Sequence, residues 1–171
     1  MKLSDAVARF LAQHVDHVFV VNGGACLHMI HSIAEYPGID YICPHHEQAA
    51  GFAADAYARL RGLGVAMTTS GPGATNLITP IAASFYDSIP VLYITGQVTT
   101  GSMTGSAGVR QLGFQETPIV EMVRPVTKFA ETLMQPERVL VMLEAAVAVA
   151  REGRPGPVLV DIPDDLQRVD I

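Results

Sequence analysis

Short apolar runs rich in β-branched residues alternate with longer helical patterns along the whole chain. Such alternation is typical of βαβ units, in which parallel strands are connected by helices that cover the sheet. The chain has 171 residues, enough for one domain with a substantial core. We therefore expect a single three-layer α/β/α domain over residues 1–171, built on a mainly parallel six-stranded sheet.

The predicted strands are short and end at turn-forming residues. They cover residues 18–21, 40–43, 65–69, 90–95, 126–129 and 157–161. Helical patterns lie between them at residues 4–13, 26–34, 74–86, 116–123 and 135–151, and a further helix runs from Glu47 to the glycines at 62 and 64. Ser4 is the expected N-cap of the first helix, because a serine hydroxyl can accept a hydrogen bond from a free backbone N–H. Residues 99–113, rich in Gly, Ser and Thr, are expected to form a mobile loop.

Composition restricts the classes of function. The chain is 49% hydrophobic and 16% charged, with a net charge of −6. It has no basic run and no interleaved aromatic and basic residues, which disfavours nucleic-acid binding. No apolar stretch reaches membrane-spanning length, and the first five residues open a polar-capped helix rather than a signal peptide. We therefore expect a cytoplasmic protein with no membrane partner.

The residues that commonly bind metals are not arranged for it. Cys26 and Cys43 do not have a metal-ligand spacing, and both are expected to be free thiols in the core. His45 and His46 are adjacent, and neighbouring side chains at a helix start point in different directions. We therefore expect no metal site within this chain.

Glu47 is the best candidate for chemistry. It starts a helix whose body, from Gln48 to Arg59, consists almost entirely of small apolar residues. A glutamate in such surroundings loses water, which disfavours its charged form and allows it to hold or share a proton near neutral pH. The competing interpretation is that the helix dipole simply favours an acid in the first turn.

Glycine turns follow several of the predicted strands, at Gly23-Gly24, at Gly71-Pro72-Gly73 and at Gly113. Ligands of open parallel sheets bind beyond the carboxyl ends of the strands, and glycine lets the backbone approach a ligand closely. Neither of the first two turns has the spacing of a dinucleotide fingerprint or of a P-loop, so these nucleotide sites are disfavoured. Each turn taken singly is also explained as a tight connection.

Together with Glu47, four segments point to a family. They are Ser70-Gly71-Pro72-Gly73-Ala74-Thr75-Asn76-Leu77, Asp87 to Gln97, Gly113-Phe114-Gln115-Glu116-Thr117 and Gly153 to Pro163. In this order they resemble the amino-terminal, pyrimidine-binding domain of thiamine diphosphate-dependent enzymes, and in particular the acetolactate synthase (acetohydroxyacid synthase) group. The resemblance covers nearly the whole chain and implies the thiamine diphosphate-binding fold.

The resemblance implies roles for individual residues. Glu47 matches the family glutamate that hydrogen-bonds N1′ of the cofactor's aminopyrimidine and so promotes loss of the proton at thiazolium C2. The matching cofactor-binding residues are Gly23, Gly24, Thr69, Pro72, Asn76 and Gln115, and Phe114 matches a residue that faces the substrate. The family often has proline before the glycine pair, whereas this chain has Asn22, which affects the expected local contact but not the fold.

The resemblance also implies partners. In the family, the diphosphate and its Mg²⁺ are bound by another domain through a Gly-Asp-Gly segment, which this chain lacks. We therefore expect the middle and diphosphate-binding domains to lie outside this chain, the isolated chain to be inactive, and the site to be completed by a second subunit of a homodimer or higher oligomer. The full enzyme could also bind FAD, through the middle domain.

The implied activity is acetolactate synthase-like carboligation of pyruvate, a 2-keto acid, as in branched-chain amino acid biosynthesis. Two alternatives remain open at the level of sequence. One is a related decarboxylase acting on a 2-keto acid or on an oxalyl-CoA-type substrate. The other is a non-catalytic module that has kept the fold, against which the intact Glu47 argues.

Overall fold

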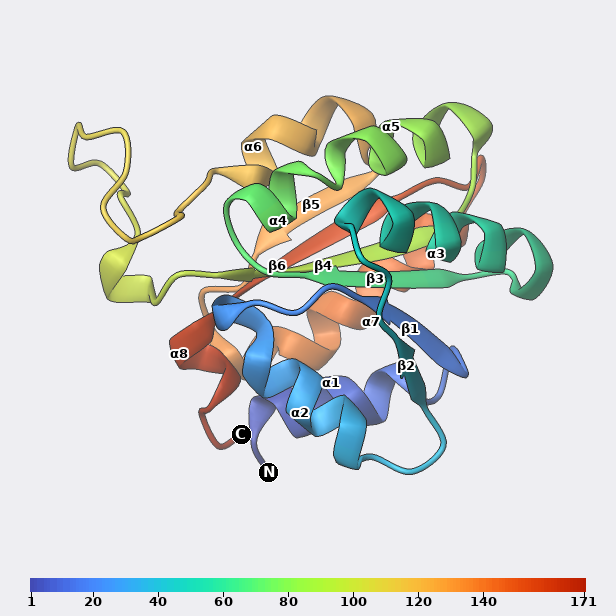
Figure 1. Ribbon diagram of the computed structural model, residues 1–171, viewed down its shortest axis with the longest axis horizontal. Helices are drawn as coiled ribbons and strands as arrows, with labels where there is room; N and C mark the ends of the chain where they lie inside the picture. The colour runs from blue at the N-terminus through green and yellow to red at the C-terminus, as the bar shows by residue number, and fades with distance from the viewer.

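The sheet at the centre of the computed structural model, which describes residues 1–171, has six strands that are all parallel (Figure 1). In spatial order they are β2 (Asp40–Ile42), β1 (His17–Val20), β3 (Gly64–Thr68), β4 (Val91–Gln97), β6 (Val158–Pro163) and β5 (Phe129–Thr132). This confirms the predicted α/β class and the strand count.

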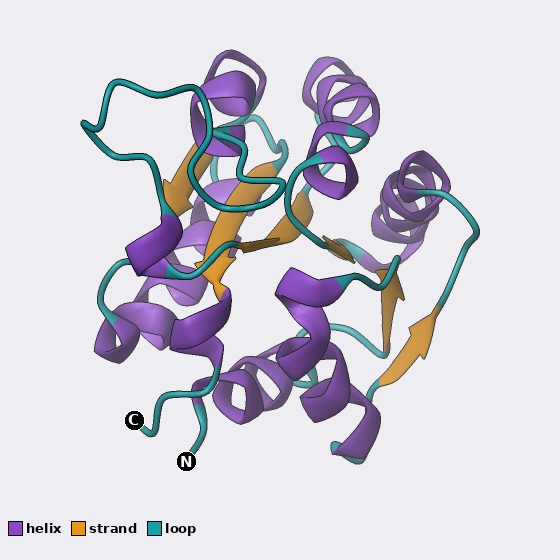
Figure 2. Ribbon diagram, turned by 60° about the vertical axis from the view of Figure 1, so that its left-hand side comes forward, coloured by secondary structure: helices purple, strands orange, loops and turns teal.

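Helices cover both faces of the sheet, as Figure 2 shows. One face carries α1 (Leu3–Leu11), α2 (Leu27–Glu35), α7 (Val139–Arg151) and the short α8 (Asp164–Gln167). The other face carries α3 (Glu47–Arg61), α4 (Pro72–Thr75), α5 (Ile78–Asp87) and α6 (Ile119–Val123). Single 3₁₀ turns complete the list: η1 (Gly24–Cys26), η2 (Thr100–Ser102), η3 (Arg124–Val126) and η4 (Pro136–Arg138).

The two faces of the sheet are packed differently. The α1–α2–α7 face forms a cluster of 27 buried residues with large aliphatic side chains from β3, β4 and β6. The α3–α5–α6 face forms a cluster of 14, with Ala50, Ala54 and Ala58 from α3. A Cβ atom on Gly64 would lie 1.9 Å from the carbonyl oxygen of Ala54, so only glycine allows α3 to approach β3 this closely. The close approach fixes the position of Glu47 at the start of α3.

One predicted helix is divided in the structure. The prediction placed a helix over residues 74–86, whereas α4 ends at Thr75 and α5 begins at Ile78. Pro80 explains the break, because proline has no N–H to donate to the carbonyl of Asn76 in a continuous helix. Restarting the helix at Ile78 places Pro80 in the first turn, where no such bond is required.

The first helix begins earlier than predicted, and Ser4 is not its cap. The N-cap is Lys2, and the N–H of Leu3 donates to the carbonyl of Val169 at 2.8 Å. Ser4 is buried inside the helix, where its hydroxyl accepts a hydrogen bond from Ser32 at 2.9 Å. Contact with the carboxyl-terminal segment therefore replaces side-chain capping, and the two chain ends lie side by side (Figure 1).

Three further predictions need correction. The fifth strand is β5 at 129–132 rather than 126–129, because Pro125 and Val126 belong to the 3₁₀ turn η3. Cys26 is a buried free thiol as predicted, but Cys43 is exposed, since it follows the edge strand β2, whose residues are all exposed. The last strand, predicted to end at Asp161, continues to Pro163, and α8 follows it directly.

No helix in the structure combines the length and the apolar character needed to cross a membrane.

Candidate functional site

The strand order reverses direction between β1 and β3. From β1 the chain crosses to β2 on one side, and it then returns to β3 on the other side of β1. In open parallel sheets, ligands bind at such a switch point, beyond the carboxyl ends of the strands. The turn with Gly23 and Gly24 follows β1, and the turn with Thr69 and Gly71 follows β3. Both predicted glycine turns therefore lie at the switch point.

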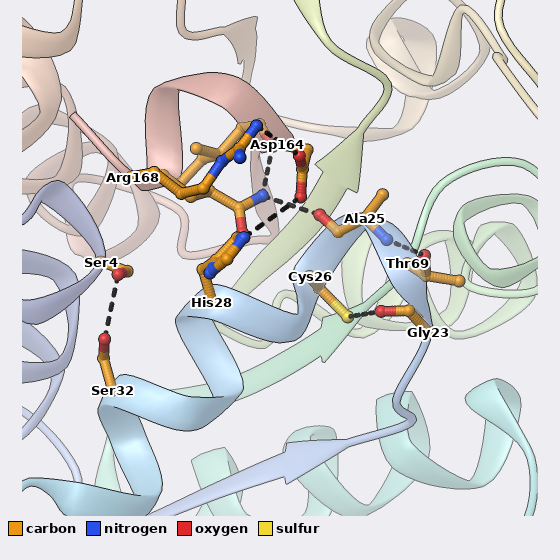
Figure 3. Close-up of polar contacts among 11 residues, drawn as sticks. Ser4, Gly23, Ala25, Cys26, His28, Ser32, Thr69, Asp164 and Arg168 are labelled. Atoms are coloured by element: carbon orange, nitrogen blue, oxygen red, sulfur yellow. Dashed lines mark hydrogen bonds and ion pairs between the residues drawn. The ribbon is translucent and has the colours of Figure 1, made fainter.

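Thr69, in the second turn, contacts the first. Its hydroxyl accepts a hydrogen bond from the N–H of Ala25 at 3.1 Å, and Figure 3 shows it beside Gly23 and Ala25. A Cβ atom on Gly23 would lie 2.4 Å from Cγ2 of Thr69, and one on Gly73 would lie 2.7 Å from the same atom. Both glycines are required because Thr69 occupies the space that their side chains would need.

Glu47 is held at the entrance to this region by Asn76. His46 caps α3, since its Nδ1 accepts a hydrogen bond from the N–H of Gln48 at 3.1 Å, and Glu47 is the first helical residue. The amide Nδ2 of Asn76 donates to Oε2 of Glu47 at 2.9 Å. Oε1 of Glu47 has no hydrogen-bond donor within the chain and lies 3.7 Å from where a Cβ on Gly73 would be. One carboxylate oxygen is thus fixed while the other faces the glycine turn, available to a ligand.

Gln115 reaches the same turn from the long loop after β4. Its φ of 61° is positive, which is uncommon for a residue other than glycine and indicates local strain. Gly71 also has a positive φ, 58°, and a Cβ atom there would lie 2.6 Å from the carbonyl oxygen of Gln115. The two backbones are therefore in close contact.

The remaining predicted residues lie on the open side of the site. Phe114 is 85% exposed, and Pro72 is exposed at the first position of α4. Gly24 has open space where a side chain would be, and it borders a shallow hollow together with Phe114 and Asp164. Asp164 is flanked by His28, whose Nε2 is 3.8 Å from its carboxylate, and by Arg168, at 3.4 Å (Figure 3).

The structure therefore brings together Glu47, Asn76, Thr69, Gly23 and Gln115 around one turn, with Gly24 and Phe114 at a neighbouring hollow. The carbonyl of Pro72 accepts a hydrogen bond from the backbone N–H of Asn76 at 3.0 Å, and its ring lies on the exposed side of α4. The roles assigned to these residues stay predictions.

Sequence reasoning missed Gln167, a residue of α8 that holds the turn containing Gly23 and Gly24. Nε2 of Gln167 donates to the carbonyls of Ala25 at 2.7 Å and of Ile162 at 2.9 Å. Gln167 is fully buried, and its Oε1 is buried without a hydrogen-bond partner. Nothing in the pattern around α8 marks Gln167 as buried, because glutamine at the end of a short helix is ordinarily exposed.

Comparison with known proteins shows the family to which the chain belongs. Residues 1–122 match the family described as "Thiamine pyrophosphate enzyme, N-terminal TPP binding domain". The chain belongs to this family. The resemblance found in the sequence is thereby confirmed, and the fold is that of the family's amino-terminal domain.

Several of the proteins similar to this chain are named acetolactate synthases. The chain is 43% identical over 157 residues to "Acetolactate synthase, chloroplastic" of Arabidopsis thaliana, covering 91% of this chain and 22% of that protein. It is 41% identical over 169 residues to "Acetolactate synthase 2, chloroplastic" of Nicotiana tabacum, covering 98% and 24% respectively. It is 42% identical to the Saccharomyces cerevisiae protein named "Acetolactate synthase catalytic subunit, mitochondrial", over 90% of this chain and 22% of that protein. The chain thus spans less than a quarter of the length of these relatives.

The residues present fit one end of the family's cofactor. An aminopyrimidine ring needs a hydrogen-bonding group and a surface against which the ring can pack. Oε1 of Glu47 offers the hydrogen-bonding group, and the Gly73 turn beside it offers the surface. No group of three or more His, Cys, Asp or Glu side chains in the chain is placed to hold a metal ion.

Proposed function

We propose that this domain binds the pyrimidine end of thiamine diphosphate in an enzyme that acts on 2-keto acids, with acetolactate synthase-like carboligation of pyruvate. The observation that carries the proposal is the Glu47 carboxylate, which is fixed by Asn76 through one oxygen and leaves the other free beside Gly73. The similarity to acetolactate synthases over nearly the whole chain supports this choice of substrate class.

The residues of this chain have separate tasks in the proposed site. When bound, thiamine diphosphate supplies a nucleophilic carbon that attacks the carbonyl group of a 2-keto acid. Glu47 exchanges a proton with the aminopyrimidine ring through Oε1, and Asn76 keeps the carboxylate in place while it does so. Thr69, Gly23 and Gly24 shape the space in which the ring system lies, and Pro72 and Gln115 border it. Phe114, which is exposed, contributes an apolar wall on the substrate side.

The proposed site needs a partner. The diphosphate and its Mg²⁺ would be held by a diphosphate-binding domain, supplied by a second subunit in a homodimer or higher oligomer. The outward face of α3 is the proposed contact surface, because it exposes Ala49, Phe52 and Ala56, and two of these side chains are small enough for close helix contact. FAD, if bound, would be bound outside this domain.

Replacement of Glu47 by glutamine in the complete enzyme tests the mechanism. Glutamine keeps the shape and the contact with Asn76 but cannot exchange the proton, so we expect kcat to fall about 100-fold or more. Glu144→Gln is the control, because Glu144 is exposed on α7, on the opposite face of the sheet. Unchanged melting temperatures would show that both variants fold. Near-normal turnover by Glu47→Gln would refute the role of Glu47.

The products formed from pyruvate test the substrate class. We expect the complete enzyme to form acetolactate, detectable by mass spectrometry after incubation with pyruvate, thiamine diphosphate and Mg²⁺. Acetaldehyde as the main product would instead favour a decarboxylase. No conversion of pyruvate, with tight binding of the cofactor, would move the proposal to another 2-keto acid or an acyl-CoA substrate.

A further inference from the structure

Residues 98–117 form the longest connection of the molecule, between β4 and α6, and they carry Phe114 and Gln115. Figure 2 shows this loop projecting from the carboxyl end of the sheet, at the upper left. Long loops in compact domains are commonly functional, but their side chains are useful only where the loop is fixed to a rigid element.

Gln97 joins the two ends of this loop. It is the last residue of β4, and its side chain is 3% exposed. Its Oε1 accepts a hydrogen bond from the N–H of Val98 at 2.9 Å, at the beginning of the loop. Its Nε2 donates to the carbonyl of Thr117 at 2.9 Å, at the end of the loop. A single buried amide group thus connects both ends.

Asp161 holds Gln97 in this orientation. Nε2 of Gln97 also donates to Oδ2 of Asp161 at 3.1 Å, so both N–H groups of the amide are used. Asp161 lies on β6, is 1% exposed, and also accepts hydrogen bonds from Thr95 at 2.7 Å and Thr132 at 3.1 Å. These contacts tie β4, β5 and β6 together and make Asp161 a rigid anchor.

The fixed end of the loop is two residues from the candidate site. Thr117 O, which accepts from Gln97, also accepts from the N–H of Ile119 at 2.8 Å at the start of α6. Gln115 lies with its backbone against Gly71, in a strained conformation that needs support from its surroundings. A shift at Thr117 therefore changes where Gln115 lies relative to the Gly71–Gly73 turn and Glu47.

We propose that Gln97 is a positioning residue of the site, which clasps the ends of the 98–117 loop and, anchored by Asp161, places Gln115 against the turn that faces Glu47. The inference rests on the proposed cofactor site for its effect on cofactor affinity, but the effect on the loop is independent of any ligand. The two can therefore be measured separately.

The test uses Gln97→Met in the complete enzyme, because methionine has a similar volume and cannot donate to Thr117 or Asp161. Gln111→Met is the matched control, since Nε2 of Gln111 also donates to a carbonyl of this loop, that of Glu116 at 3.0 Å, but does not reach the sheet. In the absence of ligand, we expect hydrogen exchange of the amides at 113–117 to speed up about tenfold in Gln97→Met and to stay unchanged in Gln111→Met. Exchange in β3 and β4 should stay as in the parent enzyme.

Kinetics provide the second measurement. We expect the KM for thiamine diphosphate to rise about tenfold in Gln97→Met, while kcat at saturating cofactor changes less than about threefold, because only the placement of a bordering residue is altered. Should Gln97→Met fail to fold, Gln97→Asn, whose amide is one methylene too short to reach Thr117, replaces it in the same tests.

Each outcome has a defined meaning. Faster exchange confined to the loop together with a raised KM supports the proposal. Unchanged exchange in the loop of a folded Gln97 variant overturns it, and so does faster exchange spread equally over the core strands. Loss of cofactor binding in Glu47→Gln is scored separately, so that failure of the proposed function is not confused with failure of this inference.

Discussion

Asp161 shows how strongly burial acts on a single side chain. Burial raises the pKa of Asp161 to about 6, although hydrogen bonds from Thr95, Gln97 and Thr132 act in the opposite direction. The ordinary value is 3.8. The folded state therefore binds a proton more tightly than the unfolded state does. The stabilisation that this provides is fully present below about pH 4 and is lost as the pH rises through about 6.

A pH series on Asp161→Asn tests this. Asparagine does not titrate, so the difference in unfolding free energy between parent and variant should change by up to about 3 kcal/mol in the variant's favour between pH 4 and pH 6.5. Urea unfolding at each pH measures it. Asp170→Asn is the control, because the Asp170 side chain is 89% exposed. An identical pH dependence in parent and Asp161→Asn would contradict the assignment.

At the scale of residues, the sequence singled out the groups that surround the Gly71–Gly73 turn better than the groups that hold them in place. Glu47 stands out because it starts a helix whose body consists almost entirely of small apolar residues. Gln97, Asp161 and Gln167 do not stand out, since each follows or ends an apolar strand or helix, where polar residues are ordinarily exposed. Their burial depends on packing between segments distant in sequence, which a local pattern does not contain.

At the scale of elements, Glu116 organises the inner part of the long loop. Its carboxylate accepts hydrogen bonds from the N–H and hydroxyl of Thr104 and from the N–H of Leu112, the last at 2.9 Å. Burial acts to raise the pKa of Glu116, but the hydrogen bonds it accepts outweigh burial and lower it. The loop is thus closed on itself by one charged side chain.

We expect Glu116→Gln to loosen this inner loop without unfolding the domain. Glutamine lacks the charge that strengthens these hydrogen bonds. Because the loop is then held less firmly, trypsin should cleave more readily after Arg110, which is exposed and makes no ion pair. Cleavage after Arg110 should be about five to ten times faster at an unchanged melting temperature. Glu121→Gln is the control, since the Glu121 carboxylate pairs with Arg124 and accepts no hydrogen bond from the loop. Equal cleavage rates would rule out this role for Glu116.

The element boundaries that the sequence missed have a common cause. The strands β3, β4 and β6 are buried along their whole length and were placed to within a residue or two, because apolar β-branched runs are unambiguous there. The edge strand β5 was displaced, since Val126 is equally apolar in a 3₁₀ turn. The break before α5 was missed because the apolar pattern continues through Pro80. Proline is compatible with a helix only in its first turn, so the helix restarts at Ile78.

At the scale of the whole molecule, the core and the candidate site lie in different parts of the domain. Buried clusters of 27 and 14 residues cover the two faces of one sheet. The candidate site, by contrast, lies beyond the carboxyl ends of β1 and β3, outside both clusters. We therefore expect the isolated chain to fold without binding the cofactor.

We expect the isolated chain to unfold in one cooperative transition in urea, followed by circular dichroism, because the sheet connects both clusters. We expect the same preparation to show no saturable binding of thiamine diphosphate at micromolar concentrations in isothermal titration calorimetry, with Mg²⁺ present. Addition of bovine serum albumin to the same titration controls for nonspecific heat. Micromolar binding by the folded chain would contradict the proposal that a second subunit completes the site, and would favour a domain that binds the cofactor on its own.

Thr69 touches the space of both Gly23 and Gly73 and also holds the N–H of Ala25. A methyl group at either glycine can be accepted only if Thr69 moves, and the direction of that movement sets how much room is left at the other glycine. Substitutions in the two turns are therefore epistatic, although the turns are far apart in the sequence. Among homologues, we expect the three positions to vary together or not at all.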